Sequence, residues 1–168
     1  MVYAYYGLGQ GKTSTLNGLC LRAINKQKPI LFVRFFKGVS SSEDFSLKQL
    51  GVEVNSFQTT NHFIWTKNIN EQQKIIEQAK QTVDYVNNNY ERFDFIFLDE
   101  AIDLVTNKIM TSNLFVDFIR KISHNKVVFI SGHYMDETIS SVCDVLTHFE
   151  KKKHHYDKGV SAIKYIDF

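Results

Sequence analysis

Six short apolar runs alternate with amphipathic segments along this 168-residue chain, and the alternation constrains its fold more than any other feature. The runs are strand-length and rich in β-branched and aromatic residues: 2–6, 29–36, 52–57, 93–98, 126–130 and 144–149. Segments with helical patterns fall at 12–26, 71–88, 111–122 and 135–142. Because parallel neighbouring strands need crossover connections, this order predicts a three-layer α/β fold with a mostly parallel central sheet of about six strands.

The composition indicates one domain with a substantial core. Apolar residues make up 43% of the chain and aromatic residues 14%, and no internal repeat or linker divides it, so we expect a single domain over 1–168. The formal net charge is only +2, and most Lys and Arg residues are scattered. Nucleic acid is therefore not an expected partner.

The sequence also predicts a cytoplasmic location. No apolar run approaches the roughly 20 residues that a membrane span needs, and the N-terminus enters a strand without the features of a signal peptide. Cys20 and Cys143 lack metal-ligand spacing and fall inside or at the ends of predicted helices. We expect both to be small buried apolar residues in a reducing compartment.

A glycine-rich loop follows the first predicted strand. "GLGQGKTS" (7–14) leads into an amphipathic helix, which is the context of a phosphate-binding P-loop, but it is one residue shorter than G-x-x-x-x-G-K-[ST]. Backbone N–H groups and the positive end of the helix can bind phosphates there, Lys12 adds a charge, and a hydroxyl of Thr13 or Ser14 can ligate Mg²⁺. The expected nucleotide contacts are Gly7, Leu8, Gly9, Gln10, Gly11, Lys12, Thr13 and Ser14. The fold is therefore predicted to be P-loop NTPase-like.

A second motif, "FIFLDEA" (95–101), ends an apolar strand in two carboxylates. In P-loop folds a carboxylate at such a strand end holds Mg²⁺ or its water shell, so Asp99 and Glu100 are the candidate metal residues. Adjacent residues at a strand end point to opposite sides, which predicts separate roles for the two. The pair does not by itself distinguish ATP hydrolysis from group transfer.

The compressed loop resembles that of the CobA-type ATP:cob(I)alamin adenosyltransferases, whose pattern is G-x-G-x-G-K-T-[ST]. The resemblance covers nearly the whole chain and includes "LRA" (21–23), "VRFFKG" (33–38), "LGVEV" (50–54), "FLDEA" (97–101) and "FISGH" (129–133). The most specific match is "KHHYDKGVSAIKYIDF" (153–168), which is similar to K-H-x-[FY]-D-x-G-V-x-A-Q-x-G-I-D-[FY]. ATP-hydrolysing relatives have no reason to share that segment.

The resemblance implies that the Co(I) of a reduced corrinoid, cobalamin or a precursor, attacks the 5′ carbon of ATP and that triphosphate leaves, in adenosylcobalamin biosynthesis or salvage. It also implies Mg²⁺, an electron-donating flavoprotein reductase and a homodimer. Since Co(I) is a strong nucleophile, no nucleophilic side chain is required. Lys12, the loop N–H groups and Mg²⁺ would stabilise the triphosphate as one leaving group.

Further roles follow from positions that match the family pattern. An F-x-W pair lies over the corrin in the family, displaces the lower axial ligand and eases the reduction of Co(II). "HFIW" (62–65) stands at the matching place, so the resemblance gives this role to Phe63 and Trp65. The alternative is that the two rings only anchor a long loop on the core. Other expected substrate contacts are Arg22, Lys37, His154, Asp157 and Gly159.

The chain departs from the family pattern at three positions. Gln10 stands where the family frequently has Lys, His133 where it has Arg, and Ile163 where it has Gln, and each change removes a possible phosphate or substrate contact. His133 can still hydrogen-bond a phosphate, but its place after a predicted strand favours a surface residue. Family members often have an N-terminal segment that closes over the site, so closure is expected from elsewhere or not at all.

Two other functions stay open on the sequence alone. A P-loop ATPase or kinase would account for the glycine loop and the carboxylate pair, but not for the C-terminal segment or the F-x-W loop. A catalytically weakened nucleotide-binding or corrinoid-binding module would account for the departures, because loss of one preorganised phosphate contact costs about 10²–10³-fold in rate.

Overall fold

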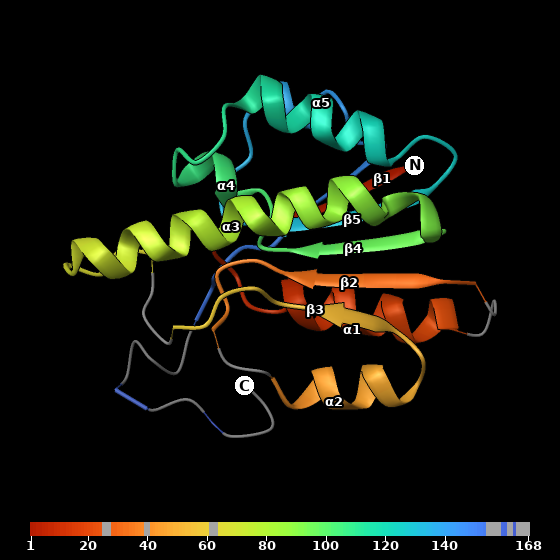
Figure 1. Ribbon diagram of the computed structural model, residues 1–168, viewed down its shortest axis with the longest axis horizontal. Helices are drawn as coiled ribbons and strands as arrows, with labels where there is room; N and C mark the ends of the chain where they lie inside the picture. The colour runs from red at the N-terminus through yellow and green to blue at the C-terminus, as the bar shows by residue number, and fades with distance from the viewer. Residues whose placement is uncertain (25–27, 39–40, 61–63, 154–158, 161–162, 164–168) are drawn as a thin grey trace.

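The computed structural model describes residues 1–24, 28–38, 41–60, 64–153, 159–160 and 163. A six-stranded, wholly parallel sheet lies at its centre, in the order β3-β2-β4-β5-β1-β6 (Figure 1). Its strands are β1 (Val2–Tyr6), β2 (Ile30–Arg34), β3 (Glu53–Asn55), β4 (Phe95–Asp99), β5 (Val127–Gly132) and β6 (Val145–His148). All six predicted strands are confirmed, and so is the α/β class of the fold.

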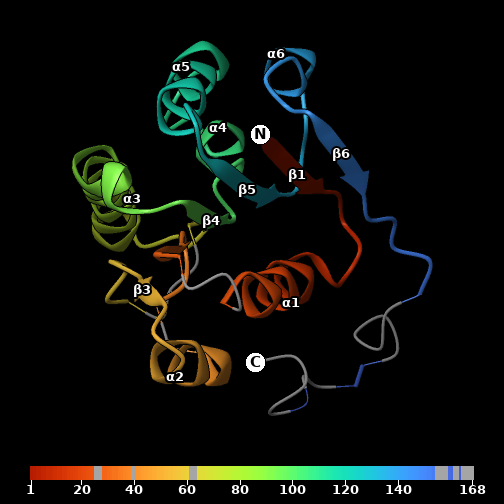
Figure 2. The ribbon, with the colours of Figure 1, turned by 90° about the vertical axis from the view of Figure 1, so that its right-hand side faces the viewer.

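Helices cover both faces of the sheet (Figure 2). On one face lie α1 (Lys12–Ile24) and α2 (Ser42–Gln49), and on the other lie α3 (Ile69–Asn89), α4 (Asp103–Thr106) and α5 (Ser112–Ile122). The short η1 (Tyr90–Arg92) precedes β4, and α6 (Glu137–Ser140) precedes β6. The predicted helices 12–26, 71–88 and 111–122 correspond to α1, α3 and α5.

The prediction of a helix over 135–142 was too long. The Asp136 side chain accepts the Ile139 N–H at 2.7 Å and so caps a helix that begins only at Glu137. From Asp144 onward the backbone pairs with β1 instead, since the Asp144 N–H donates to the Val2 carbonyl at 2.8 Å. The sequence did not predict α2 and α4, because both are short and α2 buries only Asp44 and Leu47.

Alternate side chains of the central strands enter two separate hydrophobic clusters. In β4, Ile96 and Leu98 face the cluster under α3 and α5, while Phe97 faces the cluster under α1. All three side chains are fully buried. This two-sided burial explains why the strand reads as a continuous apolar run in the sequence.

On the α1 face, aromatic rings stack across four neighbouring strands. Tyr3, Phe129, Phe97 and Phe32 occupy paired positions of β1, β5, β4 and β2. Their successive ring centroids lie 5.0, 4.4 and 5.5 Å apart. The guanidinium of Arg34 lies 4.5 Å from the centroid of the Phe32 ring and continues the stack toward the end of β2. The stack packs across the strands that carry the site and adds to the hydrogen bonds that pair them.

Because the strands are parallel, their carboxyl ends meet at one edge of the sheet. The segments after β1, β2, β4 and β5 therefore come together, and α1 begins at this edge (Figure 1). The glycine loop and the Asp-Glu pair, which are far apart in the sequence, are brought together there.

The two cysteines are protonated thiols at neutral pH. Cys20 is buried within α1 as expected, and burial raises its pKa to about 12. Cys143 lies beyond α6 and is only partly buried, with its pKa raised by burial to about 11. Neither is a candidate nucleophile. Among the described residues, no helix is long and apolar enough to cross a membrane.

The ring stack gives a prediction about stability. Phe97→Ala should lower the free energy of unfolding by about 3–5 kcal/mol, because it removes a fully buried ring and leaves a cavity between two stacked partners. Phe45→Ala is the control, since that ring is 67% exposed, and it should change the free energy by less than about 0.5 kcal/mol. Urea unfolding followed by circular dichroism measures both. Equal losses in the two variants would contradict the packing described here.

Candidate functional site

Three glycines are needed where the chain turns from β1 into α1. Gly7 and Gly11 have positive φ angles of 116° and 105°, which residues other than glycine rarely adopt. Gly9 lies directly against the backbone that follows β6: a Cβ there would come within 2.8 Å of Phe149 and Glu150 backbone atoms. The compressed loop is therefore close-packed: two of its turns require glycine, and the segment after β6 lies directly against it.

Two of the loop N–H groups are used by the protein itself. The Gly7 N–H donates to the carbonyl oxygens of Gly132 and His133 at 3.2 and 3.1 Å, and the Gly9 N–H donates to that of Phe149 at 2.8 Å. These two N–H groups of the predicted phosphate-binding loop therefore already have acceptors within the protein. The first turn of α1 still carries N–H groups without an acceptor inside the helix, together with the positive end of the helix dipole.

Lys12 lies over the loop. Its Nζ donates to the carbonyl oxygens of Gly7 and Gly9, at 2.7 and 2.9 Å. Burial lowers the pKa of the ammonium group, and the carboxylates of Asp103, Glu100 and Asp99 act in the opposite direction. The lysine thus places a cation at the start of α1, close to three carboxylates.

A cavity of about 500 Å³ opens beside the loop. Its walls come from the loop and the first turn of α1, from the end of β4 and from the end of β5. They consist of Leu8, Gly9, Gln10, Gly11, Lys12, Thr13, Ser14, Asp99, Glu100, Ser131 and His133. Every predicted loop contact except Gly7 lies on this cavity, as do both predicted carboxylates.

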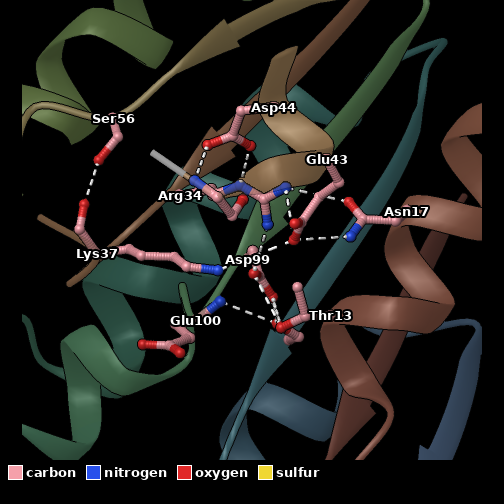
Figure 3. A network of polar contacts seen from close by, with 11 residues as sticks. Thr13, Asn17, Arg34, Lys37, Glu43, Asp44, Ser56, Asp99 and Glu100 are labelled. Atoms are coloured by element: carbon pink, nitrogen blue, oxygen red, sulfur yellow. Dashed lines mark hydrogen bonds and ion pairs between the residues drawn. The ribbon is translucent and has the colours of Figure 1, made fainter. Parts of the chain in front are cut away.

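The Asp99 carboxylate is the centre of the hydrogen-bond network at this site (Figure 3). It is 2% exposed, and it accepts from the Thr13 hydroxyl at 3.1 and 3.0 Å. It also accepts from the Ser131 hydroxyl at 2.7 Å and from Arg34 Nη1 at 3.2 Å. One side chain of β4 thereby joins α1, β5 and β2.

Arg34 is a site residue that the sequence analysis missed. It is 1% exposed, and its guanidinium contacts four side chains in addition to the Phe32 ring (Figure 3). The contacts are to Asp44 at 2.5 Å, Asp99 at 3.2 Å, Asn17 at 3.2 Å and Glu43 at 3.4 Å. The signal in the sequence was a lone arginine inside an apolar strand, which requires buried partners.

Glu100 does not point away from Asp99 as the strand alternation predicted. The chain leaves the strand at Glu100 in a left-handed conformation, with φ 60°, and its N–H donates to the Ser131 hydroxyl at 2.9 Å. Both carboxylates consequently line the same cavity. Burial, with Asp99 and Asp103 nearby, raises the pKa of Glu100 to about 7.

His133 has a side chain that is 44% exposed, in keeping with the expectation of a surface residue. The same side chain also lines the cavity beside the loop. The carboxylate of Asp103, at the start of α4, lies 2.7 Å from its Nδ1 and accepts its backbone N–H at 3.0 Å. The hydrogen bond to Asp103 raises the pKa of the imidazole.

Other predicted contacts lie farther from the cavity. Arg22 is exposed in the last turn of α1, at the opposite end of the helix from the loop, and the structure does not bring it to the site. Lys37 lies beyond β2 with its Nζ 3.9 Å from Glu43 Oε1, so it stands beside the network around Arg34 (Figure 3).

The aromatic loop and the C-terminal segment are described only in part. Trp65 is 73% exposed and lies four residues before the start of α3 at Ile69. Gly159 has a φ of 73°, and Ile163 is 53% exposed. Three predicted site residues lie outside the described residues: Phe63, His154 and Asp157.

A second cavity of about 420 Å³ adjoins the first. Leu8 and His133 line both cavities, so these side chains stand at the boundary between them. The remaining walls are mostly aromatic or apolar and come from the ends of β1, β5 and β6: Tyr6, Gly7, Tyr134, Met135, His148, Phe149, Glu150 and Lys151. The site therefore joins a polar, charged cavity to a mostly apolar one.

The residues at the first cavity suit a hard divalent cation. The Thr13 hydroxyl and the Asp99 carboxylate supply oxygen atoms, which Mg²⁺ prefers, at the start of α1. Within the described part of the chain, no group of three or more His, Cys, Asp and Glu side chains could hold a metal. A cation here would need phosphate oxygens and water to complete its coordination, as Mg²⁺ commonly does.

Known proteins resemble this chain along its whole length. The family model described as ATP:corrinoid adenosyltransferase BtuR/CobO/CobP matches residues 1–168. A curated corrinoid adenosyltransferase from Sinorhizobium sp is 24% identical over 170 residues, which cover 96% of this chain and 77% of that protein.

Solved structures match more weakly. Domain III of the Thermotoga maritima replication initiation protein DnaA has a TM-score of 0.43 and 12% identity, over 89% of this chain and 54% of that one. A DnaA bound to AMPPCP and single-stranded DNA has a TM-score of 0.43 and 17% identity, over 89% of this chain and 40% of that one. This chain thus spans about half or less of those two chains.

The buried network around Arg34 should contribute more to the free energy of unfolding than a surface ion pair does. Arg34→Met should lower the free energy of unfolding by about 3–5 kcal/mol, because Asp44 and Asp99 lose their buried counter-charge. Arg92→Met is the control, since its pair with Glu53 is 58% exposed on the arginine side and should contribute about 1 kcal/mol or less. Urea unfolding at neutral pH measures both. Similar small losses would mean that Arg34 does not hold the network together.

Proposed function

Because the chain belongs to the ATP:corrinoid adenosyltransferase family, we propose that it transfers the 5′-deoxyadenosyl group of ATP to the Co(I) of a reduced corrinoid. The observation that carries the proposal is the family match over residues 1–168, on a chain whose compressed glycine loop borders a charged cavity. Residues 1–168 then form one catalytic domain, and the corrinoid is cobalamin or a precursor of it.

The reaction makes one bond and breaks another. Co(I) attacks the 5′ carbon of ATP, the cobalt–carbon bond forms with the electron pair of Co(I), and the C5′–O bond breaks with its pair going to triphosphate. The protein has to position two substrates and stabilise a highly charged leaving group. No side-chain nucleophile takes part, and the protonated thiols of Cys20 and Cys143 agree with this.

Lys12 and the start of α1 are the groups that bind the triphosphate in this proposal. The Lys12 ammonium exchanges the carbonyl oxygens of Gly7 and Gly9 for phosphate oxygens, and the first-turn N–H groups of α1 donate to the same anion. Gln10 and Ser14 line the same cavity and add polar contacts. Charge that develops on the leaving oxygen is thereby met by fixed donors.

We further propose that Thr13 and Asp99 hold Mg²⁺ with the triphosphate, with Glu100 beside them. When bound, Mg²⁺ acts as a Lewis acid that neutralises charge on the leaving group. Asp99 is already oriented by Ser131 and Arg34, so its carboxylate needs no rearrangement of the sheet to take this role. Without a cation, the pKa of Glu100 is raised to about 7. A cation bound nearby would lower this pKa and so favour the ionised carboxylate.

The corrinoid side of the proposal involves Trp65 and Phe63, as an apolar wall that excludes the lower axial ligand and so eases reduction of Co(II). The exposure of Trp65 supports this role, since most of its ring surface is accessible to a second substrate. A flavoprotein reductase as the electron donor and a homodimer complete the proposal, together with substrate contacts from Lys37, His154, Asp157 and Gly159. Arg22 is left out of these contacts because it lies at the end of α1 away from the loop.

The test is an anaerobic assay with ATP, Mg²⁺ and chemically reduced cob(I)alamin. Formation of the light-sensitive spectrum of a cobalt–carbon bond, dependent on ATP, is the expected result. Lys12→Ala is the matched control and should abolish turnover, because it removes the only side-chain cation on the glycine loop within the described chain. If ATP is consumed and the corrinoid spectrum stays unchanged, the chain is a nucleotide hydrolase and the proposal is wrong.

Trp65→Ala should impair the reduction of Co(II) while leaving adenosyl transfer to Co(I) nearly unchanged. Reaction from cob(II)alamin with a reductant should slow by at least about tenfold, whereas reaction from prereduced cob(I)alamin should change little. Phe45→Ala, which alters an exposed ring on α2, is the control and should behave as the wild type from both starting states. Equal losses from both states in Trp65→Ala would contradict displacement of the axial ligand.

Mg²⁺ titrations of Asp99→Asn and Glu100→Gln should distinguish the two carboxylates. We expect Asp99→Asn to raise the Mg²⁺ concentration for half-maximal activity by about tenfold or more, and Glu100→Gln to raise it less, because only Asp99 contacts Thr13. Circular dichroism at each Mg²⁺ concentration checks that the variants stay folded. If neither variant changes the Mg²⁺ dependence, neither residue belongs to the metal site.

A further inference from the structure

His133 is held at two points by a single carboxylate. Asp103 Oδ2 lies 2.7 Å from the ring Nδ1, and Asp103 Oδ1 accepts the His133 backbone N–H at 3.0 Å. Asp103 itself is 4% exposed, so the carboxylate that fixes the ring is buried in the protein. Such a carboxylate keeps the proton on Nδ1 and fixes the direction of the ring.

The remaining ring nitrogen, Nε2, is the group of His133 that is left for a ligand. The imidazole is 44% exposed and lines the cavity that holds Lys12 and the first turn of α1. With Nδ1–H donating to Asp103, Nε2 is an acceptor in the neutral ring and becomes a charged donor on protonation. A polyanion in the cavity would favour the charged form.

Charged groups face His133 from every side of the two cavities. Across the first cavity, Glu100 favours its protonation and Lys12 opposes it. The second cavity adds three charged or titratable side chains near the imidazole: His148, Glu150 and Lys151. The Lys12 ammonium and the His133 imidazolium repel each other, and an anion bound in the cavity that both line reduces this repulsion. Phosphate binding and proton uptake at His133 should therefore be coupled.

We propose that His133, held by Asp103, binds the triphosphate part of ATP through Nε2–H and stabilises triphosphate as it leaves. The proposal rests on the adenosyl transfer proposed above, and it assigns to the end of β5 a cation that complements Lys12 in the same cavity. The bond changes in the reaction stay the same. His133 contributes one charge-assisted hydrogen bond to the leaving group, and triphosphate takes up a proton with it when it binds at alkaline pH.

The test measures binding of inorganic triphosphate by calorimetry between pH 6 and 9. In the wild type, affinity should fall as the pH rises through the pKa of His133, which the hydrogen bond to Asp103 raises above its ordinary value. His133→Gln should bind about 10- to 100-fold more weakly at low pH, and the smaller pH dependence that remains should be that of triphosphate, Glu100 and Lys12. His133→Arg should recover the affinity and keep it at high pH.

Two further variants make the result specific. His124→Gln changes an exposed histidine outside both cavities and should bind triphosphate as the wild type does. Asp103→Asn leaves the ring in place but removes the carboxylate charge, so the pH midpoint should move toward acid. If His133→Gln matches the wild type at every pH, or if His133→Arg does not restore binding in a folded protein, the inference is wrong.

Failure of this inference and failure of the proposed function give different results. Triphosphate binding that ignores His133, in a wild type that still adenosylates cob(I)alamin, overturns only the role of His133. A wild type that makes no cobalt–carbon bond, with pH-dependent triphosphate binding through His133, overturns the adenosyl transfer and leaves the phosphate contact in place.

Discussion

The site depends on one buried carboxylate. Asp99 ends the central strand β4 and accepts hydrogen bonds from Thr13, Ser131 and Arg34, so a single side chain ties α1, β5 and β2 together. Burying an ion pair carries a large desolvation cost, and here Asp44 shares the arginine and adds a second hydrogen bond that offsets it. The start of α1, and with it the glycine loop, is thereby fixed against the sheet before any ligand binds.

The geometry around that anchor suits a polyanion with a cation. Lys12 and the positive end of α1 lie on one wall of the cavity, and His133 lies on another. Asp99 and Glu100 add two carboxylates to the lining of the same cavity, where a metal would be shared with phosphates. Cations that can bind phosphates and carboxylates that can bind a metal thus line one cavity, and the adjoining, mostly apolar cavity gives the site a second, different surface.

Much of this could be predicted from the sequence, because local patterns determined it. Apolar runs gave all six strands, and the glycine spacing placed the loop between β1 and α1. Contacts that no local pattern shows come from partners far away in the chain: Arg34 contacts Asp99, and His133 contacts Asp103. Glu100 departs from strand alternation because its backbone turns left-handed, which no adjacent glycine signalled.

The central claim is that this site releases triphosphate as one intact group. Phosphorus NMR of a single-turnover reaction with ATP, Mg²⁺ and cob(I)alamin tests it directly, since triphosphate, pyrophosphate and orthophosphate give separate signals. The account predicts one triphosphate for each corrinoid that is adenosylated, with no orthophosphate formed in step with it. Orthophosphate or pyrophosphate as the first product would contradict attack at the 5′ carbon and would place the bond cleavage at phosphorus.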